Sequence, residues 1–133
     1  MSHVFLGGTC NGSDWRDRLI KMLRVSYFNP VVPDWNEAAY QKELQERESS
    51  TYCLYVLTPL MTGVYAVAEV VDDSNKRPNR TVLCILTVDR GASEMFNTAQ
   101  TKSMEALKKM VRKNGAHVFD NLKDVATFLN ATA

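Results

Sequence analysis

The sequence has few of the residues that build metal sites and disulfides. Its 133 residues include three cysteines and two histidines, and no two cysteines form a Cys-x-x-Cys pair. A structural zinc site needs about four such ligands at short spacings, so we expect no metal. Cys53 and Cys84 lie in apolar runs and are expected to be small core residues. An odd cysteine count without such pairs fits a reducing compartment.

Long apolar runs and a strong charge of either sign are also missing. No apolar stretch approaches the roughly 20 residues of a membrane-spanning helix, and the first residues lack the pattern of a secretory signal. The formal net charge of +1 gives no electrostatic reason to expect an anionic membrane or a nucleic-acid polymer as a partner. The sequence therefore predicts a cytoplasmic protein.

What the chain does contain is an alternation of apolar segments and helical patterns. Strands are expected near residues 4–6, 27–33, 51–57, 81–86 and 117–119. Helices are expected near residues 14–24, 37–48, 64–73, 98–113 and 122–129. The helix at 64–73 is apolar nearly all round and is expected to be buried, whereas Pro30 and Pro33 suit an edge strand or a strand exit.

Five successive strand–helix units predict one domain over residues 1–133 with a parallel sheet and right-handed crossovers. The expected architecture is α/β: a flavodoxin-like three-layer sandwich around a five-stranded parallel sheet of order 2-1-3-4-5. Ligands of such sheets bind beyond the carboxyl ends of the strands, near the switch between strands 1 and 3. Three loops should converge there, at residues 7–13, 33–36 and 58–63.

These loops supply the candidate binding residues. The first runs from an apolar strand through small and polar residues into a helix start, a layout that lets backbone N–H groups surround an anionic or polyhydroxylated ligand. A tight turn followed by a helix cap explains the same letters. The predicted substrate-binding residues of all three loops are Gly7, Gly8, Thr9, Asn11, Ser13, Trp35, Asn36, Thr58 and Gly63.

Three acidic residues are candidates for chemistry. Glu69 is the one carboxylate between Val64 and Val71, where a charge is costly unless it is paired or functional. Such a group suits attack on a sugar carbon or stabilisation of an oxocarbenium-like centre; a glutamate that reaches solvent or pairs with a lysine is the alternative. Glu43 and Asp34 are the candidates for a second carboxylate, and Trp35 suits stacking on a base, although a capped helix with a surface tryptophan explains this loop equally.

Several of these segments together resemble one family. They are Val4-Phe5-Leu6-Gly7-Gly8, Ser13-Asp14-Trp15-Arg16, Phe28-Asn29-Pro30-Val31-Val32-Pro33-Asp34-Trp35, and the strand and helix that lead to Glu69. The chain is similar here to the nucleoside 2-deoxyribosyltransferase-like proteins, over roughly residues 3 to 88. The resemblance implies a flavodoxin-like fold, a homodimer and no metal or other cofactor.

The resemblance also implies a reaction on a small nucleoside or nucleotide. Glu69 matches a nucleophile that attacks C1′ of a (deoxy)ribosyl group, and Glu43 lies where the family has a positioning or protonating aspartate. The loop at 7–13 matches the segment that holds the sugar or its 5′-phosphate, and Asp34 and Trp35 match the base-side loop. A second base then accepts the sugar in transferases, and water does so in nucleotide N-glycosidases.

The sequence also departs from the family pattern. The stretch Gly63-Val64-Tyr65-Ala66-Val67-Ala68-Glu69 has a longer glycine-to-glutamate spacing, and Thr58-Pro59 replaces an aspartate that is usual near the end of the third strand. These differences keep a non-catalytic module that binds a nucleotide or a partner as the alternative. A purely structural protein and a flavin-dependent redox protein are further alternatives on the same fold.

Overall fold

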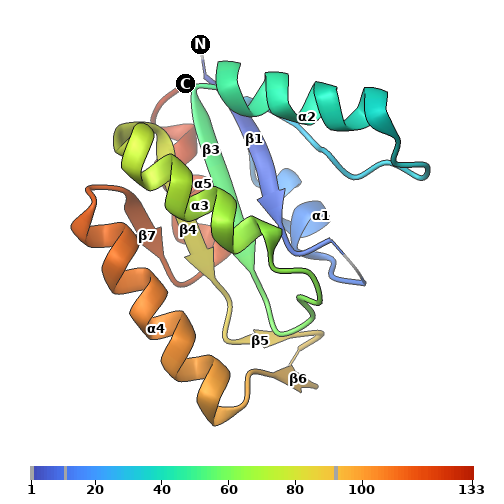
Figure 1. The fold of residues 1–133 in the computed structure, drawn as a ribbon. Helices are drawn as coiled ribbons and strands as arrows, with labels where there is room; N and C mark the ends of the chain where they lie inside the picture. Colours follow the sequence, from blue (N-terminus) through green and yellow to red (C-terminus); the bar gives the residue numbers. More distant parts are fainter. Residues whose placement is uncertain (1, 11, 92) are drawn as a thin grey trace.

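Five parallel strands form the central sheet of the computed structural model, which describes residues 2–10, 12–91 and 93–133 (Figure 1). The strands are β1 (His3–Gly8), β2 (Ser26–Phe28), β3 (Tyr52–Leu57), β4 (Thr81–Ile85) and β7 (His117–Phe119). Their order in the sheet is β2-β1-β3-β4-β7, and every pairing is parallel. The predicted order of a flavodoxin-like sandwich is thereby confirmed.

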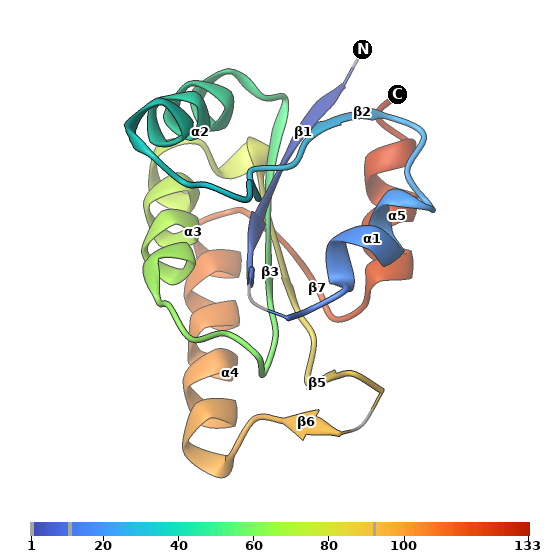
Figure 2. The same cartoon turned by 90° about the vertical axis from the view of Figure 1, so that its right-hand side faces the viewer.

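Helices cover both faces of this sheet, as Figure 2 shows. They are α1 (Trp15–Ile20), α2 (Glu37–Ser49), α3 (Tyr65–Lys76), α4 (Thr98–Lys113) and α5 (Leu122–Asn130). A short 3-10 helix, η1 (Pro78–Arg80), precedes β4, and a two-stranded hairpin, β5 (Val88–Asp89) and β6 (Glu94–Met95), precedes α4. No helix in the described part of the chain is both long and apolar enough to span a membrane.

Side chains alternate along the strands and so divide the core in two. Val4 and Leu6 face the layer of α1 and α5, where they join Trp15, Leu19 and Leu129. Phe5, Tyr55 and Leu57 face the opposite layer, where α3 and α4 contribute Val70, Leu107 and Val111. Because both faces are covered, the central strands are apolar throughout and do not alternate with polar residues.

The end of β1 approaches β3 so closely that side chains are excluded. Gly8 has a φ of +116°, and a Cβ built on it would lie 2.1 Å from the backbone oxygen of Val56. A Cβ on Gly7 would lie 2.8 Å from ring carbons of Tyr55. The two glycines are therefore required by packing where the first loop begins.

Several element predictions need correction. The helix expected at 14–24 ends at Ile20, and the strand expected at 27–33 pairs only over Ser26–Phe28, because Pro30 has no N–H to donate to a ladder. The helix expected at 64–73 extends to Lys76, and the expectation that it is buried is wrong. Only one side of it packs on the sheet, through the fully buried Val70, whereas Ala68 is exposed.

Candidate active site

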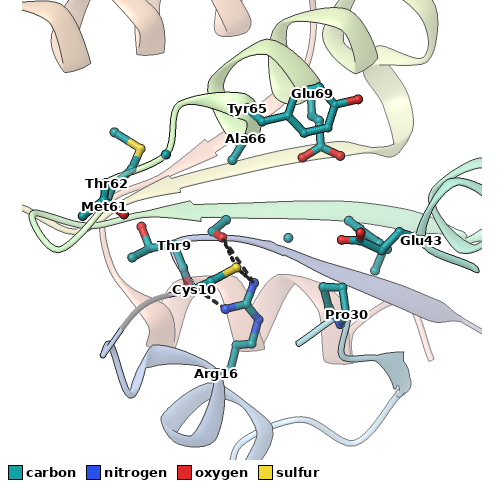
Figure 3. A pocket seen from close by; sticks show the side chains of 14 residues that line it. Thr9, Cys10, Arg16, Pro30, Glu43, Met61, Thr62, Tyr65, Ala66 and Glu69 are labelled. Carbon is teal, nitrogen blue, oxygen red and sulfur yellow. Dashed lines mark hydrogen bonds between the residues drawn. The ribbon is translucent and has the colours of Figure 1, made fainter. Parts of the chain in front are cut away.

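A cavity of about 210 Å³ opens at the carboxyl ends of β1 and β3 (Figure 3). The chain leaves β1 toward β2 on one side and returns to β3 on the other, so this is the point where the strand order reverses. Its lining comes from the β1 loop, α1, the segment after β2, α2, the β3–α3 loop and α3. We call it the glycine-loop cavity, because Gly7, Gly8 and Gly63 line it.

Arg16 holds the first loop in shape. Its guanidinium donates to the backbone oxygens of Leu6 at 3.0 Å, Thr9 at 2.6 Å and Gly8 at 3.3 Å. The side chain of Thr9 accepts a hydrogen bond from the backbone N–H of Thr58 at 3.0 Å, which joins the β1 loop to the end of β3. Burial lowers the pKa of Arg16, and the neighbouring Cys10 opposes that effect. Arg16 lines the cavity, and its guanidinium forms no ion pair with a carboxylate of the described residues.

Glu69 points into the cavity from the second turn of α3 (Figure 3). Its side chain is only 16% exposed, and burial raises its pKa from 4.5 to about 7. Arg47 lowers this pKa, while the negative charges of Glu43 and Asp73 raise it further. The carboxyl group thus changes its charge near neutral pH, which is typical of functional groups and less so of surface glutamates.

A second, smaller cavity of about 130 Å³ is lined by the same two carboxylates, Glu43 and Glu69. Glu43, Tyr65 and Glu69 line both cavities. We call the second one the aromatic cavity, because Trp35, Tyr40 and Tyr65 line it. The rings of Trp35 and Tyr40 meet edge to face with centroids 5.5 Å apart. The Trp35 indole N–H donates to Oε2 of Glu43 at 2.9 Å.

Arg47 of α2 lies beside Glu69, lines the aromatic cavity and is itself buried. Its Nη2 lies 2.8 Å from Oδ1 of Asp73 and 2.9 Å from Oδ2 of Asp72, and its Nε donates to the Tyr55 hydroxyl at 3.1 Å. Its Nε is 3.9 Å from Oε2 of Glu69. Burial would lower the pKa of Arg47, but the hydrogen bonds of Asp73 and the surrounding negative charge raise it. The guanidinium therefore stays charged beside Glu69.

Asp73 anchors this group from the interior. It is fully buried and accepts hydrogen bonds from the Tyr55 hydroxyl at 2.5 Å and from Arg77 at 2.8 Å in addition to those of Arg47. Arg77 also pairs with Glu48 at 2.7 Å. The result is a chain of charges that joins α2 to α3 and ends at Glu69. Every oxygen of Asp73 has donors, which is the condition under which a buried carboxylate is tolerated.

The structure brings six of the predicted site residues to the glycine-loop cavity: Gly7, Gly8, Thr9, Glu43, Gly63 and Glu69. Trp35 lines the aromatic cavity instead. Asn11 lies outside the described residues. The remaining four, Asp34, Ser13, Asn36 and Thr58, line neither cavity.

Local structure explains these four positions. Asp34 is exposed, and Thr58 is fully buried, where its hydroxyl accepts from the Leu60 N–H at 3.2 Å. Asn36 caps α2 by accepting from the Ala39 N–H at 2.9 Å, as its position before the helix predicted. The hydroxyl of Ser13 accepts from the N–H of Trp15 at 3.3 Å. Cap and turn geometry therefore takes these side chains away from the cavity.

Sequence reasoning missed the residues that surround the carboxylates, chiefly Arg16, Arg47, Tyr55, Tyr65 and Asp73. Arg47 was hidden in a helix with polar residues on all sides, whose pattern does not reveal a buried face. One signal was present: Tyr55 lies in a continuous apolar strand, and a buried tyrosine hydroxyl needs a polar partner. That partner is Asp73, on the helix that carries Glu69.

A comparison with family models identifies these elements. The model of the nucleoside 2-deoxyribosyltransferase-like proteins matches residues 1–87, which include every residue that lines the two cavities. The chain belongs to that family. The match to this nucleoside 2-deoxyribosyltransferase-like family ends before the β5–β6 hairpin, α4, β7 and α5. Comparisons with curated proteins and with solved structures found no match.

Among the described residues, no three histidine, cysteine, aspartate or glutamate side chains are arranged to hold a metal ion. Of the acidic residues near the cavity, Asp73 is bound to Arg47 and Glu43 to the Trp35 indole N–H, and Glu69 lies 3.9 Å from Arg47. What the arrangement offers chemically is a buried carboxylate of raised pKa, a second carboxylate close enough to affect it, and a fixed cation beside it. These groups lie between one cavity with polar loops and another with aromatic walls.

Proposed function

We propose that the protein cleaves the N-glycosidic bond of a (deoxy)nucleoside or a nucleoside 5′-monophosphate, by base exchange or by hydrolysis. The single observation that carries this proposal is the position of Glu69 between the two cavities, buried and with a raised pKa. A carboxylate there has room for a sugar on one side and for a flat ring on the other. The family match supports a nucleoside as the substrate class.

In the proposed reaction the sugar lies in the glycine-loop cavity and the base in the aromatic cavity. The carboxylate of Glu69 attacks C1′ and the C1′–N bond breaks, so the bonding electron pair moves to the base nitrogen. That nitrogen takes up a proton from Glu43, from Asp34 or from water, and the free base leaves. The sugar stays on Glu69 as a glycosyl ester.

The second step returns the enzyme to its starting state. Either water or a second base attacks C1′ of the ester, loses a proton and takes the sugar, and the carboxylate of Glu69 is released. Glu43 is the proposed positioning or acid–base group, because Trp35 holds one of its oxygens while it lines both cavities. Asp34 is exposed and lines neither cavity, so a role for this residue requires that its loop move toward the ligand.

A phosphate on the 5′ oxygen is part of the proposal because Arg16 lines the glycine-loop cavity without a carboxylate partner among the described residues. Its guanidinium supplies a positive charge at the sugar end. An anionic group at that end is favoured by such an environment.

A non-catalytic nucleotide-binding module is the second candidate. It is favoured by the sequence departures near Glu69, the longer Gly63-to-Glu69 spacing and Thr58-Pro59 in place of an aspartate. It is also favoured by the position of Asp34, since one of the proposed proton donors does not line the cavities. Binding without turnover is what this alternative requires.

One experiment separates the candidates. The purified protein and the variants Glu69→Ala and Glu69→Gln are incubated with nucleosides and nucleoside 5′-monophosphates, with and without a second free base, and the products are identified by mass spectrometry. Free base released by the wild type alone supports a hydrolase, and a new nucleoside supports a transferase. Binding without any product supports the binding module, and activity retained by Glu69→Gln would contradict the proposed nucleophile.

The homodimer that the family resemblance implies is also proposed. An apolar groove between α3 and α4 is available for a second copy, and it is lined by Met61, Val64, Val67, Met104 and Met110 among others. Met61 also lines the glycine-loop cavity, so a copy bound in the groove would lie beside the site. Light scattering after size exclusion tests the dimer, and Val67→Lys should then yield a monomer.

A further inference from the structure

We infer that Arg47 is a positioning residue for Glu69, a fixed cation that the buried Asp73 and Tyr55 hold beside the carboxylate throughout the reaction. No contact with a ligand is needed for this role, because it acts on the charge of the Glu69 carboxylate; Arg47 also lines the aromatic cavity beside Glu69. The expected effect on kcat/KM rests on the proposed function, but the expected effect on the pKa of Glu69 does not.

The distance of 3.9 Å between Arg47 Nε and Glu69 Oε2 is longer than a hydrogen bond. The carboxylate oxygens of Glu69 are therefore not occupied by this cation and stay available to a ligand in the cavity. A charge at this distance still lowers the energy of the ionised carboxylate, the more so where burial has removed water.

Partners other than the Glu69 side chain hold the Arg47 guanidinium in place. Arg47 donates to Asp73, to Asp72 and to the Tyr55 hydroxyl, and its hydrogen bond to Glu69, at 3.4 Å, goes to the backbone oxygen. Its hydrogen bonds therefore do not depend on the Glu69 carboxylate. Formation of a glycosyl ester would remove the negative charge of Glu69. Arg47 would keep its partners and its position, and the same cation would be in place when the carboxylate is released. Charged groups that are already in place stabilise the charges of a reaction most effectively, because no rearrangement is needed while the reaction proceeds.

Other titratable groups around Glu69 also act on the charge of its carboxylate. They are Tyr40 and Glu43 on α2, Tyr65, Asp72 and Asp73 on α3, Tyr55 on β3, and Arg16 on α1 across the cavity. Tyr65 and Tyr55 are neutral at pH 7, since burial raises the pKa of each above its ordinary value. Glu43 and Asp73 raise the pKa of Glu69, and Arg47 is the cation that lowers it.

The test measures the ionisation of Glu69 directly. Carboxyl carbons of ¹³C-glutamate-labelled protein are followed by NMR against pH, and Glu69→Gln assigns the signal. Arg47→Gln should move the midpoint of Glu69 upward by about one pH unit. The matched control is Glu48→Gln, the next residue on α2, which pairs with Arg77 and not with Arg47; it should leave the midpoint unchanged. The acidic limb of kcat/KM against pH should move with the NMR midpoint.

A folded Arg47→Gln protein whose Glu69 midpoint equals that of the wild type would overturn the inference. Should this variant fail to fold, Arg47→Lys decides, because a lysine keeps the charge but cannot donate to Asp73, Asp72 and Tyr55 together. An upward shift smaller than one unit supports the inference, and no shift overturns it. A shifted midpoint in a protein without turnover would contradict the proposed function alone, whereas turnover with an unshifted midpoint would contradict only the role of Arg47.

Discussion

Glu69 and Asp73 lie one turn apart on α3 and face the same guanidinium, yet at different distances. Arg47 approaches Oδ1 of Asp73 to 2.8 Å and Oε2 of Glu69 only to 3.9 Å. Asp73 is hydrogen-bonded on both oxygens and fully buried, so it is held in one place. Glu69 has the cation nearby but keeps its oxygens toward the cavity, which is why the two carboxylates are suited to different tasks.

The first prediction concerns the pH dependence of turnover. A nucleophilic Glu69 has to be ionised, and burial raises its pKa to about 7. We therefore expect kcat/KM to rise about tenfold per pH unit below pH 7 and to level off above it. Steady-state rates between pH 5 and 9 measure this. A rate that falls through the same range would show that the protonated carboxyl group is the active form.

The second prediction concerns stability. The pKa of Glu69 rises from 4.5 to about 7 on folding, so the folded state binds the proton more tightly than the unfolded state. This group therefore destabilises the fold progressively as pH rises from 4.5 to 7, and the effect is complete above 7. Glu69→Gln should raise the free energy of unfolding at pH 8 by roughly 1–3 kcal/mol.

The measurement for Glu69→Gln is urea unfolding of both proteins at pH 5 and pH 8. The gain over the wild type should be larger at pH 8, because the wild-type carboxyl group is then ionised. Equal gains at the two pH values would mean that burial of the charge is not the cause.

The third prediction tests the interior end of the charge chain. Asp73→Ala should lower the free energy of unfolding by about 3–5 kcal/mol, because it leaves Arg47, Arg77 and the Tyr55 hydroxyl without their common acceptor. Glu48→Gln removes only the exposed end of the same chain and should leave the unfolding midpoint nearly unchanged. Chemical denaturation of both variants provides the comparison, which fails if they are equally stable.

The fourth prediction compares two glycines of the cavity. Gly8→Ala should destabilise the fold by at least about 2 kcal/mol, because its φ is +116° and its Cβ would meet the Val56 carbonyl. Gly63→Ala has no atom within 4 Å of the new Cβ and should be neutral or stabilising by up to about 1 kcal/mol. Thermal unfolding decides, and a stable Gly8→Ala protein would show that the end of β1 can shift away from β3.

The fold was predictable because each strand–helix unit has a local signature. The apolar runs near residues 4–6 and 51–57 and the cap at Asn36 are recognisable from neighbouring residues alone. The boundaries were less so: α1 ends early, and the hairpin β5–β6 lies where a loop was expected. Short elements of this kind depend on contacts distant in the sequence, such as the one between Arg90 and the Gly12 oxygen at 3.2 Å.

The candidate site divides in the same way. Glu69 stood out as one charge in an apolar helix, and the glycines of the first loop stood out by their position after a strand. Arg47 did not, because nothing in the polar stretch around it distinguishes the one residue that turns inward. Its importance depends on the crossing of α2 over α3, which brings residues 22 to 26 positions apart into hydrogen-bond distance.

By itself the sequence determined the α/β class and a glutamate in the helix after the third strand, since strand and helix periodicity and the rarity of a charge among apolar residues are local properties. The strand order followed from the rule for five successive strand–helix units. The tertiary structure alone decided which polar residues surround that glutamate. It brought Arg16, Arg47 and Tyr55 to it and left Asp34, Asn36 and Thr58 outside the cavities. The physical reason is that burial and charge pairing depend on packing between distant segments, and these determine the pKa of Glu69.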